Sequence, residues 1–224
     1  MTKERRLVVF DVDGTLVDSQ ADIVASMGAA FDVVNLDPPE RSEVLSIVGL
    51  SLPQAMARLA PGADNDGLVA AYKDAYVARR AAAGSEVSSP LYLGARAALE
   101  RLHAMPDVVL GVATGKSRRG LDLLLEAYDL TSFFVTQQVA DFHPSKPHPS
   151  MLFKAMDETG VGAGHAVMVG DTSFDMQMAQ SAGLPFVGVS WGYHPVIDLT
   201  GAVAVLDAFE DLDAVLNNIW KREQ

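Results

Sequence analysis

The chain has no cysteine among its 224 residues. This absence excludes disulfides, thiolate zinc sites, iron–sulfur clusters and catalysis by a cysteine nucleophile. Long apolar runs are also lacking, and no stretch approaches the ~20 residues of a membrane span. The apolar run that begins at Leu7 ends at Asp11, which makes it too short for a signal peptide. We therefore expect a soluble, cytoplasmic protein with no membrane partner.

Basic residues are scarce in this chain. There are 17 Lys and Arg against 29 Asp and Glu, for a formal net charge of −12. Nucleic acids and anionic membrane surfaces are bound by basic patches, so we expect no nucleic-acid partner. Hydrophobic residues make up 49% of the chain, a composition typical of a globular protein. The length favours one domain with an insertion, and the sequence leaves the oligomeric state open.

Short apolar runs alternate with helical patterns over most of the chain. The runs predict strands at 7–10, 108–113, 133–136, 166–169, 186–189 and 203–206. Apolar residues three or four positions apart predict helices at 121–130, 151–156, 174–182 and 212–219. This alternation is typical of a parallel sheet covered by helices on both faces. The sequence therefore predicts an α/β fold with a Rossmann-like parallel-sheet core.

Residues 19–83 interrupt the alternation. Apolar residues recur there at helical spacing in three stretches, 23–34, 52–59 and 68–76, with no convincing strand between them. Residues 84–90, rich in Gly, Ser and Pro, indicate a hinge-like linker. We therefore expect an α/β core made of residues 1–16 and 89–224, with a helical domain of residues 17–88 inserted after the first strand.

Polar residues follow the predicted strands at the points where these end. Asp11 and Asp13 follow the first strand, Thr114 follows the second, and Asp171 follows the strand at 166–169. The carboxyl ends of parallel strands meet at one edge of the sheet, where such folds bind their ligands. The loop that carries Lys146 precedes a helix and adds an ammonium to this set.

This combination of side chains indicates phosphoryl chemistry with a divalent cation. Clustered carboxylates need a cation, because like charges a few ångströms apart raise one another's pKa. Oxygen ligands suit Mg²⁺, which keeps several waters and shares the phosphate oxygens of a substrate. An aspartate can attack phosphorus, while a second one protonates the leaving oxygen and then activates water. The pattern therefore predicts a small phosphorylated metabolite as the substrate.

Four motifs in order identify a family resemblance. D-x-D-G-T at 11–15, the hydroxyl of Thr114, Lys146 and G-D-x-x-x-D at 170–175 together resemble the haloacid dehalogenase superfamily. The stretches 11–19 and 146–149 resemble its phosphoglycolate phosphatase branch. The likeness covers nearly the whole chain, because that branch carries a helical cap domain after the first strand. It implies a Mg²⁺-dependent phosphatase whose cap closes over the core, with 2-phosphoglycolate as the leading candidate substrate.

The resemblance also implies a metal site made of aspartates. Asp11 would be the nucleophile and a Mg²⁺ ligand, and Asp13 would be the general acid/base and give its backbone carbonyl to the metal. Asp171 would be a further ligand, and Asp175 would support the water shell of the metal or Lys146. Asp175 could also cap the helix that it begins, since aspartate is favoured in a first turn.

The remaining implied roles concern the phosphate and the rest of the substrate. Thr114 and the Gly115 N–H would hold the phosphoryl oxygens, and Lys146 would bridge the nucleophile and the phosphate. Gly49 lies in the stretch 48–51, which resembles the cap loop that relatives present to the substrate.

The sequence argues against two sister branches of the superfamily and leaves two other functions open. True dehalogenases lack the second aspartate of the first motif, which is Asp13 here. Phosphonatases carry a Schiff-base lysine where this chain has Leu52, which forms no imine. A β-phosphoglucomutase-like phosphomutase would use the same catalytic residues, and a catalytically inactive regulatory or binding protein could use the same scaffold. An intact Asp13 favours catalysis over mere storage of a phosphoryl group.

Several other charged residues have open roles. We expect Lys116 to be a solvated residue at a helix start. Arg79 and Arg80 end the third helical stretch and would be solvated there, or would clamp an anionic substrate tail. His143 and His148 share the Lys146 loop, where they would stabilise the loop, face solvent, or touch a substrate or a zinc ion.

Overall fold

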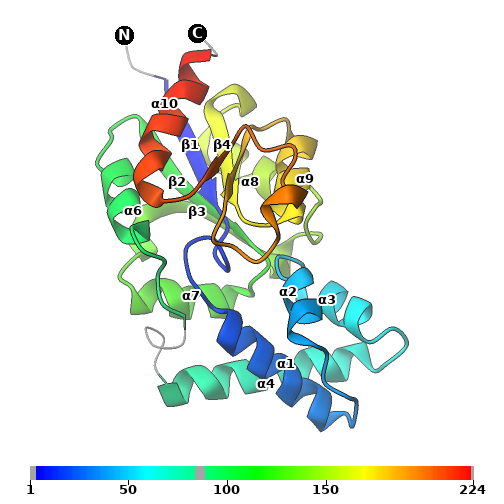
Figure 1. The fold of residues 1–224 in the computed structure, drawn as a ribbon. Coiled ribbons are helices and arrows are strands. Elements are labelled where there is room, and N and C mark those ends of the chain that lie inside the picture. Colours follow the sequence, from blue (N-terminus) through cyan, green and yellow to red (C-terminus); the bar gives the residue numbers. More distant parts are fainter. Residues whose placement is uncertain (1–3, 84–88, 223–224) are drawn as a thin grey trace.

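The computed structural model describes residues 4–83 and 89–222, and its centre is a six-stranded parallel sheet (Figure 1). The strand order is β3-β2-β1-β4-β5-β6, so that β1 lies in the middle between β2 and β4. The strands are β1 (Arg6–Phe10), β2 (Val108–Thr114), β3 (Phe134–Val139), β4 (Ala166–Gly170), β5 (Phe186–Val189) and β6 (Ala204–Leu206). The α/β fold with a parallel-sheet core is confirmed.

Helices cover both faces of the sheet, which explains why the central strands are apolar throughout. Side chains alternate between the two faces of a strand. In β1, Val8 and Phe10 belong to one hydrophobic cluster, whereas Leu7 and Val9 belong to another. The first cluster is completed by α6 (Ala95–His103), α7 (Arg118–Ala127) and α10 (Leu212–Arg222), and the second by α8 (Ser150–Thr159) and α9 (Ser173–Ala182).

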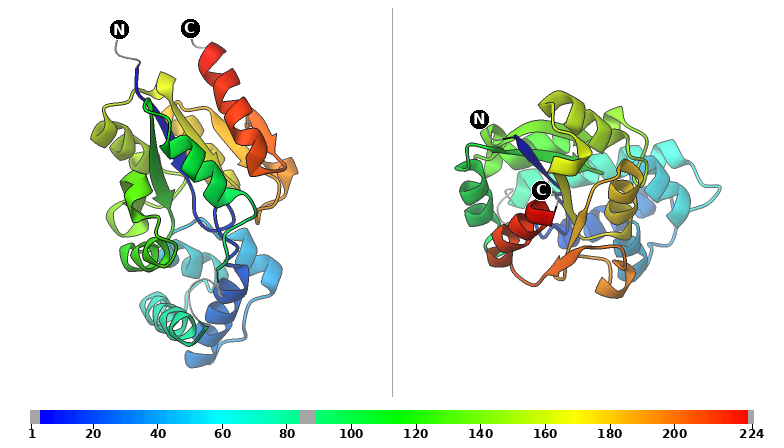
Figure 2. Two further views of the ribbon diagram at one scale, coloured as in Figure 1. Left: turned by 90° about the vertical axis from the view of Figure 1, so that its left-hand side faces the viewer. Right: turned by 90° about the horizontal axis from the view of Figure 1, so that it is seen from above.

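A separate group of helices follows β1 and lies below the sheet in Figure 1. These cap helices are α1 (Gln20–Val33), α2 (Arg41–Ser46), α3 (Leu52–Leu59) and α4 (Asn65–Ala83). They share a hydrophobic cluster of their own, which Phe174 of α9 joins from the sheet side. Figure 2 shows the cap helices from the side and from above, next to the end of the sheet. The domain boundaries expected near residues 16 and 88 stay predictions.

The structure corrects the expected elements in three places. Helix α2 was missed because six residues are too few for a periodic pattern, although Glu40 and Glu43 form a capping box at its start. Helix α6 was also missed, despite buried residues that recur at helical spacing. Strand β3 extends to Val139, beyond the expected end, and Gln138 is held there by hydrogen bonds to Thr136 and Glu158.

Short 3₁₀ helices connect several elements of the core: Thr131–Phe133, Ala140–Phe142, Ala163–His165, Val196–Asp198 and Phe209–Asp211. The expected linker at 84–90 lies largely outside the described residues. In the part of the chain that the structure describes, no helix combines the length and the apolar character needed to cross a membrane.

Candidate active site

Asp11 and Asp171 lie where the order of strands in the sheet reverses. Asp11 directly follows β1, and Asp171 directly follows β4, which pairs with β1. The Asp11 N–H donates to the Val169 carbonyl at 2.9 Å, so the two strand ends stay in register. Both carboxylates are buried, with 1% and 0% of each residue exposed. This is the position at which open parallel sheets bind ligands.

The turn after Asp13 is shaped around Asp171. Gly14 has φ +81°, and a Cβ atom there would lie 2.2 Å from Asp171 Oδ2. Thr15 Oγ1 donates to Asp171 Oδ1 at 2.9 Å, and the Tyr193 N–H donates to Asp171 Oδ2 at 2.9 Å. Gly14 of D-x-D-G-T therefore leaves room for the Asp171 carboxylate, and Thr15 of the same motif binds it.

Lys146 is fully buried between two carboxylates. Its Nζ lies 3.0 Å from Asp11 Oδ1 and 2.6 Å from Asp175 Oδ1. The other oxygen of Asp175 accepts hydrogen bonds from the backbone N–H and the hydroxyl of Thr172, at 3.1 and 2.7 Å. Together Thr172 and Asp175 form the capping box of α9. Asp175 thus caps a helix and contacts Lys146 at the same time.

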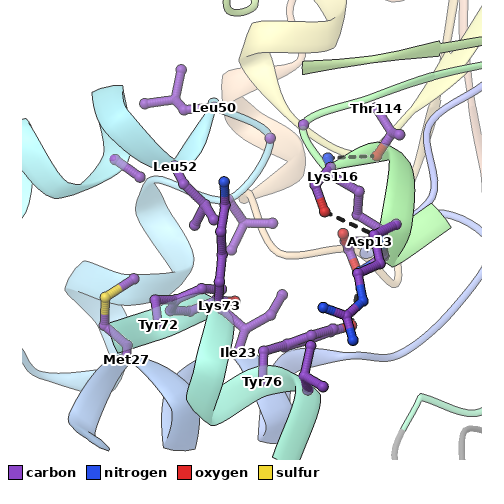
Figure 3. Close-up of a pocket in the computed structure, with 18 of the residues that line it drawn as sticks. Asp13, Ile23, Met27, Leu50, Leu52, Tyr72, Lys73, Tyr76, Thr114 and Lys116 are labelled. Carbon is purple, nitrogen blue, oxygen red and sulfur yellow. Dashed lines mark hydrogen bonds and ion pairs between the residues drawn. The ribbon is translucent and has the colours of Figure 1, made fainter. Parts of the chain in front are cut away.

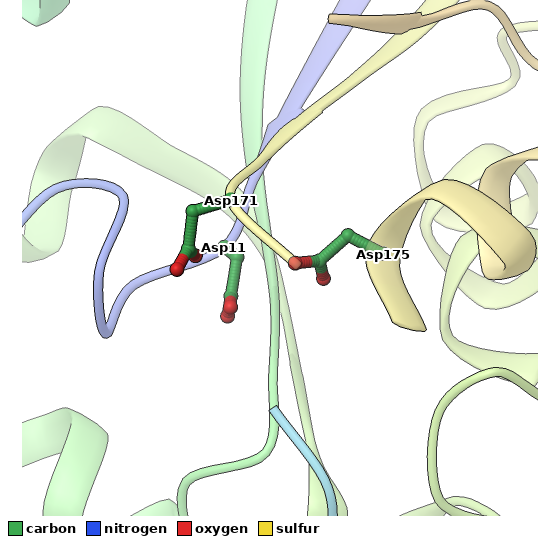
Figure 4. Close-up of side chains that lie close together, drawn as sticks. All are labelled: Asp11, Asp171 and Asp175. Atoms are coloured by element: carbon green, nitrogen blue, oxygen red, sulfur yellow. The ribbon is translucent and has the colours of Figure 1, made fainter. Parts of the chain in front are cut away.

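The carboxylates of Asp11, Asp171 and Asp175 converge on one point (Figure 4). Each offers an oxygen, and these oxygens lie within 4.8 Å of one another. Burial raises the pKa of Asp11 to about 7, although the Lys146 ammonium opposes the rise. Burial, followed by the charges of Asp175 and Asp11, also raises the pKa of Asp171 well above its usual value.

This group of carboxylates fits a hard divalent cation. Among the described residues, Lys146 is the one cation in contact with it, so negative charge is left in excess. Asp11 Oδ1 is buried and accepts no hydrogen bond of good geometry within the described chain. Mg²⁺ prefers such carboxylate oxygens. Asp11 and Asp171 could hold it directly, whereas both oxygens of Asp175 already accept hydrogen bonds.

Asp13 lies beside this group and is held by side chains from both parts of the molecule. Lys116 Nζ donates to Asp13 Oδ1 at 2.7 Å, and Ser19 Oγ donates to the same oxygen. The Ser19 N–H donates to the Tyr193 hydroxyl at 2.8 Å. Lys116 Nζ also donates to the hydroxyl of Tyr76, which belongs to α4, at 3.0 Å.

Lys116 is therefore not the solvated residue that we expected. Only 7% of its side chain is exposed. Burial alone would lower the pKa of Lys116, but its interactions with Asp13 and Tyr76 together outweigh burial, so the pKa of Lys116 is raised and its ammonium form is stabilised. The prediction was wrong because Asp13 and Tyr76 lie far from Lys116 in the sequence and reach it only through the fold.

Thr114 ends β2, and Gly115, which follows it, lies next to a loop of the cap. Thr114 is buried, with 1% exposed. A Cβ on Gly115 would lie 2.7 Å from the Leu50 carbonyl and 2.8 Å from the Gly49 carbonyl. The structure thus brings Gly49 and Gly115 together, although they lie in different parts of the chain. The neighbouring Ser51 N–H donates to Ser145 Oγ, one residue before Lys146, at 2.8 Å.

A cavity of about 460 Å³ opens between the core and the cap helices (Figure 3). Its catalytic end is lined by Asp11, Asp13, Thr114, Gly115 and Lys116. The cap loop at 47–50, residues of α1, α3 and α4, the start of α7 and Asp141 line the remainder. Of the four predicted catalytic residues, Asp11, Asp13 and Thr114 therefore line one cavity of ligand size, whereas Lys146 is buried behind Asp11 and does not line it.

The histidines and arginines that the sequence left open do not line this cavity. His143 contacts Gln138 and Ser150 at the edge of the sheet, and burial lowers the pKa of His143. His148 is exposed. Arg79 forms an ion pair with Asp22, in which Nε of Arg79 lies 3.5 Å from Oδ1 of Asp22. Arg80 is 5% exposed and donates to Tyr76, so the expectation of a solvated Arg80 was wrong.

Sequence reasoning missed the contacts that hold Asp13 and Asp171. Thr15, Ser19 and Tyr193 all contact Asp13 or Asp171, or link to them by one hydrogen bond. Thr15 belongs to the D-x-D-G-T motif and could have been found from it. Tyr193 follows β5 in an irregular loop and has no sequence signal of its own.

Comparisons with known proteins agree with this geometry. The family described as haloacid dehalogenase-like hydrolase matches residues 8–189. The chain is 33% identical over 220 residues to a Dickeya dadantii protein named "Probable phosphatase IndB", covering 96% of this chain and 95% of that protein. It is 33% identical over 193 residues to the phosphoglycolate phosphatase of Pseudomonas fluorescens, covering 84% of this chain and 71% of that protein.

Solved structures support the same fold. A hydrolase from Pseudomonas syringae superposes with a TM-score of 0.83 at 24% identity, covering 96% of this chain and 99% of that one. A haloacid dehalogenase-like family protein from Streptococcus pneumoniae superposes with a TM-score of 0.82 at 21% identity, covering 94% of this chain and 98% of that one.

Proposed function

This chain belongs to the haloacid dehalogenase-like hydrolases, and we propose that it is a Mg²⁺-dependent phosphatase that cleaves a small phosphorylated metabolite through an aspartyl-phosphate. The observation that carries the proposal is the close approach of the Asp11, Asp171 and Asp175 carboxylates, with Asp11 also lining one end of the cavity. Relatives named as phosphatases support the same reaction.

In this proposal Asp11 is the nucleophile. One of its carboxylate oxygens attacks phosphorus, and the bond between phosphorus and the ester oxygen breaks. Lys146 lies 3.0 Å from Asp11 Oδ1 and orients that carboxylate, while Asp175 holds Lys146 from the other side. Thr114 and the Gly115 N–H bind the phosphoryl oxygens.

Asp13 moves the protons. It donates a proton to the leaving alcohol in the first step, and it then accepts one from the water that hydrolyses the aspartyl-phosphate. Phosphate leaves and Asp11 is regenerated. Asp11 and Asp171, together with the backbone carbonyl of Asp13, would hold Mg²⁺, with Asp175 behind them. The bound ion would neutralise charge on the carboxylates and on the phosphoryl group.

The direct test is hydrolysis of 4-nitrophenyl phosphate with Mg²⁺ and with EDTA. We expect turnover only with Mg²⁺. The Asp11→Asn variant should lose at least about a thousandfold in kcat, because no carboxylate is left to attack. Asp157→Asn, on the exposed side of α8, is the matched control and should behave as wild type. Wild-type turnover in Asp11→Asn would overturn the assignment of the nucleophile.

The names of relatives make 2-phosphoglycolate the reference substrate for such assays. Isomerisation of a sugar phosphate without net release of phosphate would instead identify a phosphomutase. A protein that binds phosphate esters and turns none over would be the inactive scaffold. A cytoplasmic location and the lack of nucleic-acid and membrane partners stay predictions.

A further inference from the structure

The cavity has two ends of different chemistry. Near Asp11 and Thr114 it is polar, as a phosphoryl site requires. Away from them most of its wall consists of aliphatic and aromatic side chains, among them Ile23, Met27, Leu52, Tyr72, Tyr76 and Leu123. We call this end the apolar chamber. Figure 3 shows its labelled side chains on the cap side, opposite Asp13 and Thr114.

Two stacked aromatic rings form part of the wall of the apolar chamber. The rings of Tyr72 and Tyr76 stack along α4, with centroids 6.0 Å apart and planes inclined by 16°. The Tyr76 hydroxyl contacts both Lys116 and Arg80 at 3.0 Å, which fixes the orientation of the ring. Such stacked rings offer a large surface to an apolar or aromatic ligand.

No buried cation of the described residues remains available in this chamber for a second anionic group. Lys116 is the buried cation that lines the cavity, and it is already paired with Asp13. The cavity is also lined by two exposed cations, Lys73 and Arg119, and by two exposed carboxylates, Asp74 and Asp141. Among the described residues, a carboxylate drawn into the chamber would lose hydration and find only these exposed cations as counter-ions. Solvent screens their charge and the two exposed carboxylates offset it, so burial of the carboxylate is unfavourable.

We propose that the apolar chamber binds the leaving group, and that the preferred substrates are phosphate monoesters of alcohols with an apolar, ring-bearing group. This inference rests on the proposed phosphatase function. It places 2-phosphoglycolate, whose leaving group is a two-carbon acid, among the poorer substrates. A cavity of about 460 Å³ also exceeds what that acid would fill.

A series of esters of primary alcohols tests the inference, because their leaving groups have similar intrinsic reactivity. We would compare kcat/KM for ethyl, butyl, hexyl and 2-phenylethyl phosphate with that for 2-phosphoglycolate, all with Mg²⁺. We expect kcat/KM to rise by about fourfold per added CH₂ until the chamber is filled. 2-Phenylethyl phosphate should exceed 2-phosphoglycolate at least tenfold. A flat series, or the highest kcat/KM for 2-phosphoglycolate, would overturn the inference.

A variant pair assigns the effect to the chamber. Leu52→Asn makes the wall polar with little change in volume, and should lower kcat/KM for 2-phenylethyl phosphate about tenfold while changing that for ethyl phosphate less than twofold. Leu93→Asn is the control, because Leu93 is 93% exposed and does not line the cavity. Equal losses on both esters in Leu52→Asn, at unchanged Tm, would contradict a role of the chamber in binding the leaving group.

The affinity of the wild-type protein for compounds that it cannot hydrolyse tests the apolar chamber independently of the proposed phosphatase activity. Phosphonates are not hydrolysed, so calorimetry with 3-phenylpropylphosphonate and with 3-phosphonopropionate reports affinity alone. We expect the phenyl compound to bind at least tenfold more tightly, and equal or reversed affinities would overturn the inference. If the phenyl compound binds more tightly but no ester is hydrolysed, the phosphatase proposal fails and the chamber stands as a binding site.

Discussion

The charges of individual residues at the catalytic end of the cavity are paired unevenly. Asp13 has Lys116 as a close partner, whereas Asp11 and Asp175 share Lys146, and Asp171 accepts hydrogen bonds from Thr15 and the Tyr193 N–H. Removing one partner of a buried ion pair leaves the other charge without compensation. The two lysines therefore have distinct places: Lys146 contacts the proposed nucleophile Asp11, and Lys116 contacts Asp13, the carboxylate proposed to move protons.

Lys116→Met should lower kcat while leaving KM within about threefold of wild type. The methionine keeps the bulk of the side chain but removes the contacts to Asp13 and Tyr76. Since acid–base catalysis contributes roughly 10²–10⁴-fold, misplacing Asp13 should reduce kcat about 10- to 100-fold. The measurement is steady-state hydrolysis of 4-nitrophenyl phosphate.

Lys154→Met is the control for this variant. Lys154 lies on α8, with 48% of its side chain exposed, and within the described residues its ion pairs are with Asp157 and Glu158 of the same helix. Unchanged kcat in Lys116→Met would show that the contact to Asp13 does not serve the reaction.

At the scale of elements, glycines decide how closely the cap loop approaches the core and how helices end. Gly115 permits contact between the end of β2 and the loop at 49–50. Gly160 ends α8 in the left-handed region, with φ +67°. Gly28, by contrast, lies inside α1, where glycine is a poor helix former.

Gly115→Ala should weaken substrate binding. Its Cβ would lie 2.7 Å from the Leu50 carbonyl, so the cap loop would have to move away from the core. We expect KM to rise about tenfold, or 1.4 kcal/mol in binding, with little change in Tm. Gly162→Ala meets no atom within 4 Å and should keep the wild-type KM. An unchanged KM in Gly115→Ala would mean that the cap loop does not need this close contact.

Gly28→Ala and Gly160→Ala should change stability in opposite directions. Neither added Cβ would meet an atom within 4 Å, so the backbone conformation at each position determines the change in the free energy of unfolding. In α1, alanine should stabilise by about 0.5–1 kcal/mol. At Gly160, the left-handed conformation should cost about 1–2 kcal/mol. Urea unfolding measures both, and a destabilised Gly28→Ala would contradict this account.

At the scale of the whole molecule, the metal site should link stability to Mg²⁺ and to pH. The raised pKa of Asp11, about 7 in the folded protein, means that the folded metal-free protein keeps a proton that the unfolded chain loses above about pH 4. The stability contributed by this group is therefore present below pH 4 and is lost as the pH rises through 7. Mg²⁺ competes with that proton.

The rise in Tm on adding Mg²⁺ should consequently be larger at pH 8 than at pH 5. At a hundredfold excess over Kd, binding stabilises by about 2.7 kcal/mol, which corresponds to a rise of about 5–10 °C for a chain of this size. Differential scanning fluorimetry with Mg²⁺ and with EDTA at each pH measures this rise in Tm. Asp11→Asn should lose most of this pH dependence, and an equal rise at both pH values in wild type would contradict it.

The sequence by itself determined the fold class and the residues at the end of each strand. A strand buried on both faces must be apolar throughout, and helices that cover a sheet must repeat apolar residues every three or four positions. These are local patterns, so the parallel sheet and the placement of Asp11, Thr114 and Asp171 at its edge could be read from the chain. The short α2 could not, because six residues are too few for a period.

Only the tertiary structure decided how the site is held and what its cavity is made of. Lys116 meets Asp13 across 103 positions of sequence, and Tyr193 meets Ser19 across 174. The wall of the apolar chamber combines residues of α1, α3, α4 and α7 that share no motif. Such contacts depend on how separate elements pack, because packing, rather than local sequence, sets which side chains face a shared space.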